Sequence, residues 1–511
     1  MITAIINCFA MPTPLTSRHV AVIGAGAAGL VAARELRREG HEVVIFERET
    51  QIGGTWVYDP RAEPDPMSLD KNRSIIHSSL YSSLRTNLPR EVMGFRDYPF
   101  ISIADKTRDS RRFPGHREVL FYLRDFAREF EIGEMVRFET EVVHVGLVED
   151  SNKWKLRYRK KRSEVDAEAE TGDGFDYDDE IYDAVLVCNG HYTEPRVADI
   201  PGISSWPGKQ MHSHNYRVPE PFQDQVVVLI GGSASAVDIS RDIASVAKEV
   251  HVASRSVANE KYEQQPGYDN IWLHSMIESV HEDGSLVFRN GRVVQADIIL
   301  HCTGYKYHFP FLETNGIVTV EDNRVGPLYK HVFPPVLAPS LSFIGLAWKV
   351  LLCVMPFFFP WWGLGGIFKV VPFPMFEFQS KWIAGVLSGR IALPLQEEMM
   401  EDIEDFYRSL EASNFPKRYT HYMGDSQFDY NNWLAAQCGC EGFEEWKKQM
   451  YYATSKNRQV RPDTYRDEWE DDPLISEANQ DFILKGFANS LISQDSGLNG
   501  QSESHEKLSR I

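Results

Sequence analysis

A glycine-rich turn between a buried strand and a helix constrains the fold of this chain more than any other feature. Residues 19–23 (HVAVI) are continuously apolar, as in a buried parallel strand, and residues 31–40 (VAARELRREG) have a helical pattern that ends in glycine. Gly24, Gly26 and Gly29 lie in the spacing G-x-G-x-x-G. This arrangement is typical of a Rossmann-type unit, whose glycines form the turn, admit a pyrophosphate and let the helix pack on the strand.

A carboxylate and a second glycine pair indicate that this first unit binds FAD. Glu47 ends the next apolar strand, at the distance where a carboxylate accepts a hydrogen bond from a ribose hydroxyl. The sequence GGTW follows, so that Gly54, Thr55 and Trp56 come soon after this acid. Additional close backbone contact suits a long dinucleotide, and FAD fits better than NAD. The alternative for GGTW is an ordinary type II turn.

A second strand–turn–helix begins at Asp224 and has smaller residues in place of two glycines. The positions expected to contact a nucleotide in this turn are Gly231, Ser233, Ser235 and Ala236. Its next strand ends at Ser254 and Arg255, where an acid would favour NAD and an arginine accommodates the 2′-phosphate of NADP. Together the two units predict FAD and NADPH as cofactors.

The segment between these units carries a family signature. WPGKQMHSHNY, residues 206–216, resembles the motif of the class B flavin-dependent monooxygenases, F-x-G-x-x-x-H followed by Tyr or Phe. Trp206, Gly208, His212 and Tyr216 match it, with Trp in place of Phe. Tyr216 favours the flavin-containing monooxygenase branch over the Baeyer–Villiger branch. The resemblance implies that His212 and Tyr216 position the cofactor and that His212 is not a base.

The resemblance covers nearly the whole chain. Further matching segments are YSSLRTNLPREVMGF from Tyr81, FPGHREVLFYLRDFA from Phe113, DIILHCTGYKYHFPFL from Asp297 and YRDEWEDD from Tyr465. The last is similar to the C-terminal signature of the plant S-oxygenating, glucosinolate S-oxygenase-like group. It implies an enzyme in which NADPH reduces FAD, O₂ adds at the flavin C4a carbon, and a soft nucleophile takes the distal peroxide oxygen.

The same resemblance implies that Asn87, in RTNLP, is the catalytic residue. Its carboxamide can donate a hydrogen bond to the flavin peroxide and stabilise it. Without the family, Asn87 would be interpreted as a turn-capping residue. The expected substrate is a thioether such as a methylthioalkyl glucosinolate. An N-hydroxylating sibling that takes an amine, and an inactive flavoprotein, remain as alternatives.

The predicted fold class is α/β, with two Rossmann-like domains and the FAD domain interrupted by a smaller NADPH domain. The expected divisions are a leader at 1–17, the FAD domain at 18–205 and 326–472, the NADPH domain at 206–325, and a polar, disordered tail at 473–511. Residues 184–195 and 298–310 each combine a strand with a glycine loop. We expect the chain to cross between the domains at these two segments.

An apolar run, residues 351–370 (LLCVMPFFFPWWGLGGIFKV), interrupts the second part of the FAD domain. Its length suits a membrane span, but one crossing would place two parts of one domain on opposite sides of a bilayer. The dipeptide K-V occurs at both 349–350 and 369–370. We therefore expect no transmembrane span and interpret the run as an insertion from alternative splicing or a gene-model error. A re-entrant or surface-anchoring loop is the alternative.

Charge and cysteine content exclude other classes of protein. The net charge of −19 argues against a nucleic-acid partner, because phosphate binding needs an excess of Lys and Arg. Six cysteines without C-x-x-C predict no disulfide framework and no metal site. A flavin disulfide reductase needs a redox dithiol, and Cys438 and Cys440 are too close together in sequence. We expect a cytoplasmic enzyme; the oligomeric state and the start at Met1 or Met11 stay open.

Overall fold

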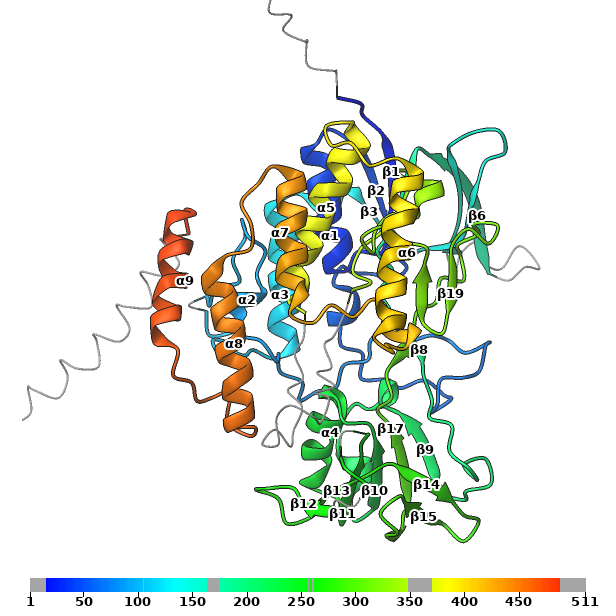
Figure 1. Ribbon diagram of the computed structural model, residues 1–511, viewed down its shortest axis with the longest axis vertical. Coiled ribbons are helices and arrows are strands. Elements are labelled where there is room, and N and C mark those ends of the chain that lie inside the picture. Colours follow the sequence, from blue (N-terminus) through cyan, green and yellow to red (C-terminus); the bar gives the residue numbers. More distant parts are fainter. Residues whose placement is uncertain are drawn as a thin grey trace, which may run out of the picture.

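The computed structural model describes residues 15–103, 105–162, 174–255, 257–259, 262–347 and 370–487. It consists of two units, each built on a largely parallel sheet, which follow one another along the long axis of the molecule (Figure 1). The predicted α/β class with two Rossmann-like units is confirmed.

The first unit contains a five-stranded sheet in the order β21-β7-β1-β2-β3, with every pair parallel. Its strands are β1 (His19–Ile23), β2 (Glu42–Phe46), β3 (Val136–Arg137), β7 (Ala184–Val187) and β21 (Leu341–Phe343). The continuous apolar runs in β1 and β7 follow from this arrangement, because a central parallel strand is buried on both faces.

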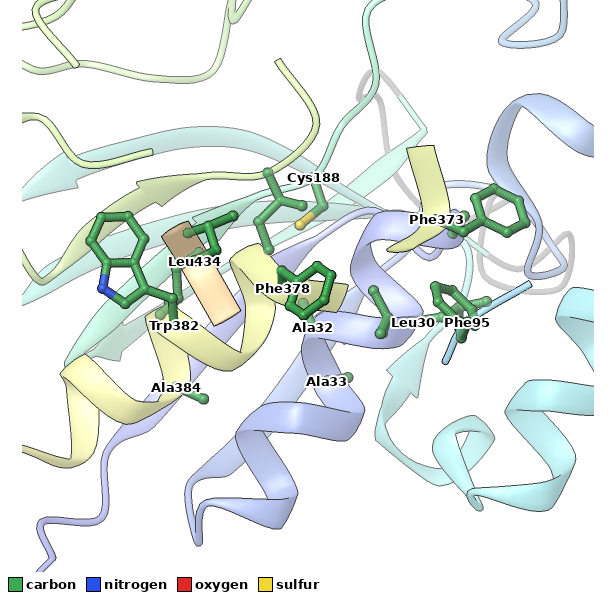
Figure 2. Close-up of a cluster of buried hydrophobic side chains, with 14 of the residues drawn as sticks. Leu30, Ala32, Ala33, Phe95, Cys188, Phe373, Phe378, Trp382, Ala384 and Leu434 are labelled. Carbon is green, nitrogen blue, oxygen red and sulfur yellow. The ribbon is translucent and has the colours of Figure 1, made fainter. Parts of the chain in front are cut away.

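Helices cover one face of this sheet and an antiparallel sheet covers the other. Val20 and Val22 of β1 face the core formed with α1 (Ala27–Arg38) and α5 (Pro372–Ser388). Ala21 and Ile23 alternate with them and face the β4–β6 meander. Figure 2 shows side chains of α1 and α5 meeting in the first core. The remaining strands of the layer are β4 (Thr140–Leu147), β5 (Trp154–Lys161) and β6 (Phe175–Tyr182).

Further helices surround this unit at its edge. They are α2 (Arg90–Met93), α3 (His116–Glu129), α6 (Gln396–Ala412), α7 (Ser426–Cys438), α8 (Glu445–Val460) and α9 (Asp472–Leu484). The last helix corrects the sequence prediction of a disordered tail from residue 473. Ala478 and Phe482 lie one turn apart and are buried, and the Phe482 ring packs edge-on against Trp446 of α8.

The second unit contains a six-stranded sheet in the order β12-β13-β11-β10-β17-β9, in which only the edge pair β12–β13 is antiparallel. Its strands are β9 (Lys209–His212), β10 (Val226–Ile230), β11 (Glu249–Ala253), β12 (Tyr262–Gln264), β13 (Ile271–His274) and β17 (Ile298–His301). Helix α4 (Ala234–Ala244) covers one face. The other face packs against β14 (Ile277–Val280), β15 (Ser285–Phe288) and β16 (Val293–Gln295).

The chain passes between the units through two short strands that pair with each other. These are β8 (Glu194–Pro195) and β18 (Tyr305–Lys306), which lie in the two segments predicted as crossovers. The expected end of the second domain at residue 325 is wrong. Tyr307 and Phe311 pack in the core of the first unit. The hairpin of β19 (Thr319–Glu321) and β20 (Arg324–Gly326) joins the same core through Val325. The return therefore occurs at β18.

The interpretation of residues 351–370 falls almost entirely outside the described residues, which resume at Val370. Ala347 and Val370, at the two ends of this gap, belong to one small apolar cluster together with Met375 and Met423. Among the described helices, none is both long enough and apolar enough to cross a membrane.

Candidate functional site

The first glycine turn has the geometry that its spacing predicts. Gly24 has a φ of +101°, and a side chain there would place its Cβ 2.7 Å from the Cys188 carbonyl oxygen. A Cβ at Gly29 would lie 1.9 Å from the Gly24 carbonyl oxygen, so this glycine lets α1 approach the turn. Gly26 forms the N-cap of α1 and, as a glycine, supplies no side-chain cap for that helix end. Its free backbone N–H groups suit an anionic phosphate.

The acid and the second glycine pair meet this turn. The Glu47 carboxylate is buried and accepts hydrogen bonds from the backbone N–H groups of Ala25 (2.8 Å) and Glu49 (2.9 Å). Burial raises its pKa. The first residue of η1 (Gly54–Trp56) lies directly over Gly26, because a Cβ on Gly54 would be 3.0 Å from the Gly26 Cα. The segment that carries Gly54 and Thr55 therefore packs against the first glycine turn.

The ring of Trp56 packs edge-on against Phe373 of α5, at 6.5 Å between ring centroids. It joins the GGTW segment to the helical layer of the first unit. The turn, Glu47 and the GGTW segment are thus brought together as the sequence predicts, and their contacts with FAD stay a prediction.

The second glycine turn repeats the backbone of the first. Gly231 has a φ of +138°, and a Cβ there would lie 2.5 Å from the Cys302 carbonyl oxygen. Ser233 is the N-cap of α4, again without a side-chain cap. Ala236 is fully buried where the first turn has Gly29, whereas Ser235 is exposed. An uncapped helix N-terminus therefore occurs in both units.

Arg255 follows β11 and lies among other cations. It is exposed, and its Nη2 is 3.4 Å from the hydroxyl of Tyr419, which belongs to η6 (Lys417–Tyr419) of the first unit. The Arg418 guanidinium lies over the same ring, 5.1 Å from its centroid. Burial, with the charges of Arg418 and Arg255, lowers the pKa of Arg196. We call Arg196, Arg255 and Arg418 the arginine group.

Among the described residues, Asp322 is an acid close to the arginine group, with its carboxylate 3.8 Å from Arg418 Nη1. Within the part of the chain that the structure describes, the buried Nε of Arg418 has no hydrogen-bond partner. The adjacent Ser254 is buried, and its backbone N–H donates to His274. The group therefore offers positive charge from both units beside the end of β11, and only Arg255 was found from the sequence.

The family-motif residues His212 and Tyr216 are structural in their contacts. His212 is fully buried; its Nδ1 accepts from the His214 backbone N–H at 3.1 Å, so Nε2 donates to the Gly304 carbonyl oxygen at 3.1 Å. Burial lowers its pKa to about 3, so the ring is neutral. The Tyr216 hydroxyl donates to Asp242 of α4 at 2.6 Å. These contacts agree with a positioning role and leave His212 no free nitrogen for base catalysis.

Asn87 lies where the two units meet. It is half-buried in the turn before α2, and its Oδ1 accepts from Arg466 Nη2 at 2.7 Å and from the Tyr465 hydroxyl at 3.0 Å. Arg466 also contacts Asp238 of α4, at 2.9 Å. Asn87 is therefore linked through one guanidinium to the helix that follows the second glycine turn.

Tyr465 and Arg466 had no assigned role in the sequence. They begin YRDEWEDD, and the signal that could have indicated them is an aromatic residue and an arginine at the start of an acidic run. Such an acidic run is usually solvated, so the sequence did not indicate a buried residue there. In the structure, Tyr465 is only 1% exposed.

Comparisons with known proteins identify the family of this chain. The family model described as Flavin-binding monooxygenase-like matches residues 17–261 and 257–441. Flavin-containing monooxygenase FMO GS-OX-like 4 of Arabidopsis thaliana is 63% identical over 476 residues, which cover 92% of this chain and 98% of that protein. Flavin-containing monooxygenase FMO GS-OX5 of the same plant is 60% identical over 484 residues, or 94% and 98% of the two chains.

Solved structures give the same result. The S-allyl-L-cysteine S-oxygenase of Allium sativum is 60% identical, with a TM-score of 0.84 over 92% of this chain and 99% of that chain. Tmm from Pelagibacter, at 23% identity and a TM-score of 0.67, covers 88% and 93% and shares the fold. The resemblance to flavin monooxygenases is confirmed. The chain belongs to the flavin-binding monooxygenase-like family and is an NADPH-dependent flavin monooxygenase with FAD and NADPH as its cofactors.

Proposed function

We propose that this enzyme S-oxygenates a thioether: thioether, O₂, NADPH and H⁺ give sulfoxide, NADP⁺ and H₂O. The substrate class is a thioether similar to a methylthioalkyl glucosinolate. Its similarity to plant GS-OX-like proteins and to an S-allyl-L-cysteine S-oxygenase supports this choice of atom.

The residues of both turns fit the two dinucleotides. Gly26 is half-buried and has no side chain that would keep a pyrophosphate away from the backbone of the turn. Glu47 lies beside the first glycine turn, where its carboxylate can accept from a ribose hydroxyl. In the second unit Ser233 is the corresponding residue, and the arginine group would neutralise a 2′-phosphate. When bound, FAD would accept electrons from NADPH and activate O₂.

The observation that carries the proposal is the place of Asn87. It lies at the junction of the two units, bonded to a residue that also contacts α4, the helix that follows the second glycine turn. Its carboxamide is a neutral donor and needs no proton transfer to act. A neutral donor at this junction suits stabilisation of negative charge that develops on oxygen. Oxygenation without a nucleophilic side chain needs this arrangement.

The first experiment is purification followed by three measurements on the native chain: flavin absorbance, NADPH consumption and product mass. We expect a yellow protein that forms sulfoxide from a methylthioalkyl glucosinolate or an S-alkyl cysteine. Hydroxylation of a primary or secondary amine with no sulfoxide would favour the N-hydroxylating alternative. A colourless protein that does not take up added FAD would favour the inactive alternative.

We predict that Asn87→Ala and Asn87→Ser retain FAD but divert NADPH consumption to hydrogen peroxide. Loss of one donor to a developing oxyanion lowers a rate by roughly 100-fold in well-studied enzymes. A decrease of roughly tenfold in the rate of sulfoxide formation would be enough to support this role of Asn87. Asn87→Asp sharpens the experiment, because it keeps an acceptor for Arg466 while it replaces the N–H donor by a carboxylate oxygen that repels developing negative charge. Sulfoxide yield per NADPH and peroxide are measured together. Unchanged coupling in all three variants would contradict the role of Asn87.

A further inference from the structure

Two side chains of YRDEWEDD determine which end of the Asn87 carboxamide is free. The Arg466 Nη2 and the Tyr465 hydroxyl both donate to Asn87 Oδ1, at 2.7 and 3.0 Å. A guanidinium carries five N–H donors and no acceptor, so only the amide oxygen can face Arg466. The amide nitrogen must therefore point the other way. Within the described residues, the hydrogen bonds of the Asn87 side chain are both made by Oδ1, and its NH₂ group has none.

The donor on the arginine is itself held in place. Besides Asn87, Arg466 donates from Nε to the Thr86 carbonyl oxygen at 3.0 Å and from Nη2 to Asp238 Oδ2 at 2.9 Å. Asp238 belongs to α4, and its carboxylate charge raises the pKa of Arg466 against the effect of burial. The guanidinium thus contacts the backbone before Asn87, the side chain of Asn87 and the second unit at once.

The loop that carries these residues is docked independently of Asn87. Arg85 forms a two-pronged contact with Asp467, at 2.8 and 2.9 Å, and Arg241 of α4 contacts Asp463 at 2.8 Å. The Tyr465 ring packs edge-on against Phe113. Because these contacts remain when the Asn87 bonds are removed, the loop offers a way to separate docking from orientation.

We propose that Tyr465 and Arg466 are positioning residues: they fix the Asn87 carboxamide with its NH₂ group free for the reacting oxygen. This inference rests on the proposed function. If the two donors were lost, the amide could rotate and present its oxygen, which repels developing negative charge. Acting through Asn87, they raise the share of NADPH that ends in sulfoxide. The competing outcome is O₂, NADPH and H⁺ giving H₂O₂ and NADP⁺.

The test compares Tyr465→Phe, Arg466→Lys and Arg466→Met with a matched control, Asp467→Asn. The control removes the Arg85 ion pair from the same loop and leaves the Asn87 bonds intact. We expect a severalfold rise in peroxide per NADPH for Arg466→Met, a smaller rise for Tyr465→Phe, and partial rescue by Arg466→Lys. Asp467→Asn should couple like the native enzyme. Equal coupling in all four variants, or equal uncoupling by Asp467→Asn, would overturn the inference.

A second measurement needs neither cofactor nor turnover. In the apoprotein, Tyr465→Phe should lower the denaturant midpoint in the native background and have little effect when Asn87 is already Ala, because the hydroxyl then has no amide oxygen to bind. Tyr465→Phe keeps the packed ring and should fold even if Arg466→Met does not.

The two measurements separate the inference from the function on which it rests. If the native enzyme makes no sulfoxide but the two midpoint shifts are non-additive, the proposed substrate chemistry fails and the positioning contact stands. If the enzyme makes sulfoxide but the shifts are additive and peroxide does not rise, the chemistry stands and the positioning role is overturned.

Discussion

In both units a glycine of positive φ follows the strand that leads into the turn, β1 or β10. The carbonyl oxygen of the cysteine that follows a neighbouring strand occupies the space where its side chain would be. The Cβ-to-oxygen distances would be 2.7 Å for Gly24 and Cys188, and 2.5 Å for Gly231 and Cys302. Each of these glycines also donates its N–H to the end of the second strand, at 2.8 and 2.9 Å. The two turns therefore have the same backbone geometry.

The units differ in what lies around that backbone. A Cβ at Gly29 would clash with the first turn, whereas the second turn accepts the buried methyl group of Ala236. Hence α1 lies closer to its turn than α4 does. The second strand ends in the buried Glu47 in one unit and in the exposed Arg255 in the other. We therefore expect the shared backbone geometry to bind phosphate and the residue at the strand end to select the nucleotide.

The largest effect should come from Gly29→Ala, which imposes the second unit's residue on the first. The added methyl would lie 1.9 Å from the Gly24 carbonyl oxygen, so α1 or the turn must move. We expect most of the bound FAD to be lost while isolated NADP⁺ binding persists. Flavin absorbance of the purified variant and calorimetric titration with NADP⁺ measure the two. Full flavin content would show that the closeness of α1 is not needed.

The next effect concerns the strand ends. Arg255→Ala should weaken NADPH binding by roughly tenfold and leave NADH nearly unchanged, because a charge-assisted contact contributes about 1.5–3 kcal/mol. Arg418→Ala should act in the same direction. Lys417→Ala is the matched control, since this neighbouring cation pairs with Glu321 at 2.9 Å instead of joining the arginine group. Equal losses for NADPH and NADH would assign Arg255 another role.

A smaller effect is expected from an interruption that only the first unit has. Deletion of Leu351 to Val370 would place Val350 before Val371, and Ala347 and Val370 already contact one cluster. We expect more soluble protein and a higher FAD content, because a long apolar run favours aggregation. NADPH affinity should not change. Loss of flavin on deletion, or transcripts that always encode the run, would make it a native element.

The smallest effect should be that of Ala236→Gly, the reverse exchange. It removes a buried methyl group and adds backbone freedom to α4, at a cost of up to about 1 kcal/mol. A thermal melt should show a drop of a few degrees, and NADPH affinity should stay the same. A marked gain in NADPH affinity would mean that the methyl group keeps α4 too far from the nucleotide.

Local patterns predicted the parts of the fold that depend on local sequence. The first predicted strand and helix occur at β1 and α1. The apolar residues that identified them are the residues that are buried in the structure. Helix α9 was missed because polar composition was taken as disorder, although Ala478 and Phe482 have helical spacing. The second unit's end was placed too late because pairing of β8 with β18 is a long-range contact.

The candidate site was predicted to a similar extent. The turns, Glu47 and Arg255 follow from spacing. Asn87 is 378 and 379 positions from its partners Tyr465 and Arg466. Arg255 is 164 positions from Tyr419, which lies in the turn that carries Arg418. No periodicity records such pairs, so single-sequence reasoning could name one partner and not the other.

The pairing of β21 with β7 has a consequence for biosynthesis. β7 ends at Val187, but its partner strand β21 (Leu341–Phe343) is made only much later in the chain. The second unit's sheet is complete once residues 298–301 have been made. During translation the second unit can therefore fold first, as a contiguous piece of chain, while the edge of the first sheet stays open. The unit that begins synthesis is the last to close, so an apolar segment between β21 and α5 emerges from the ribosome while that closure is under way.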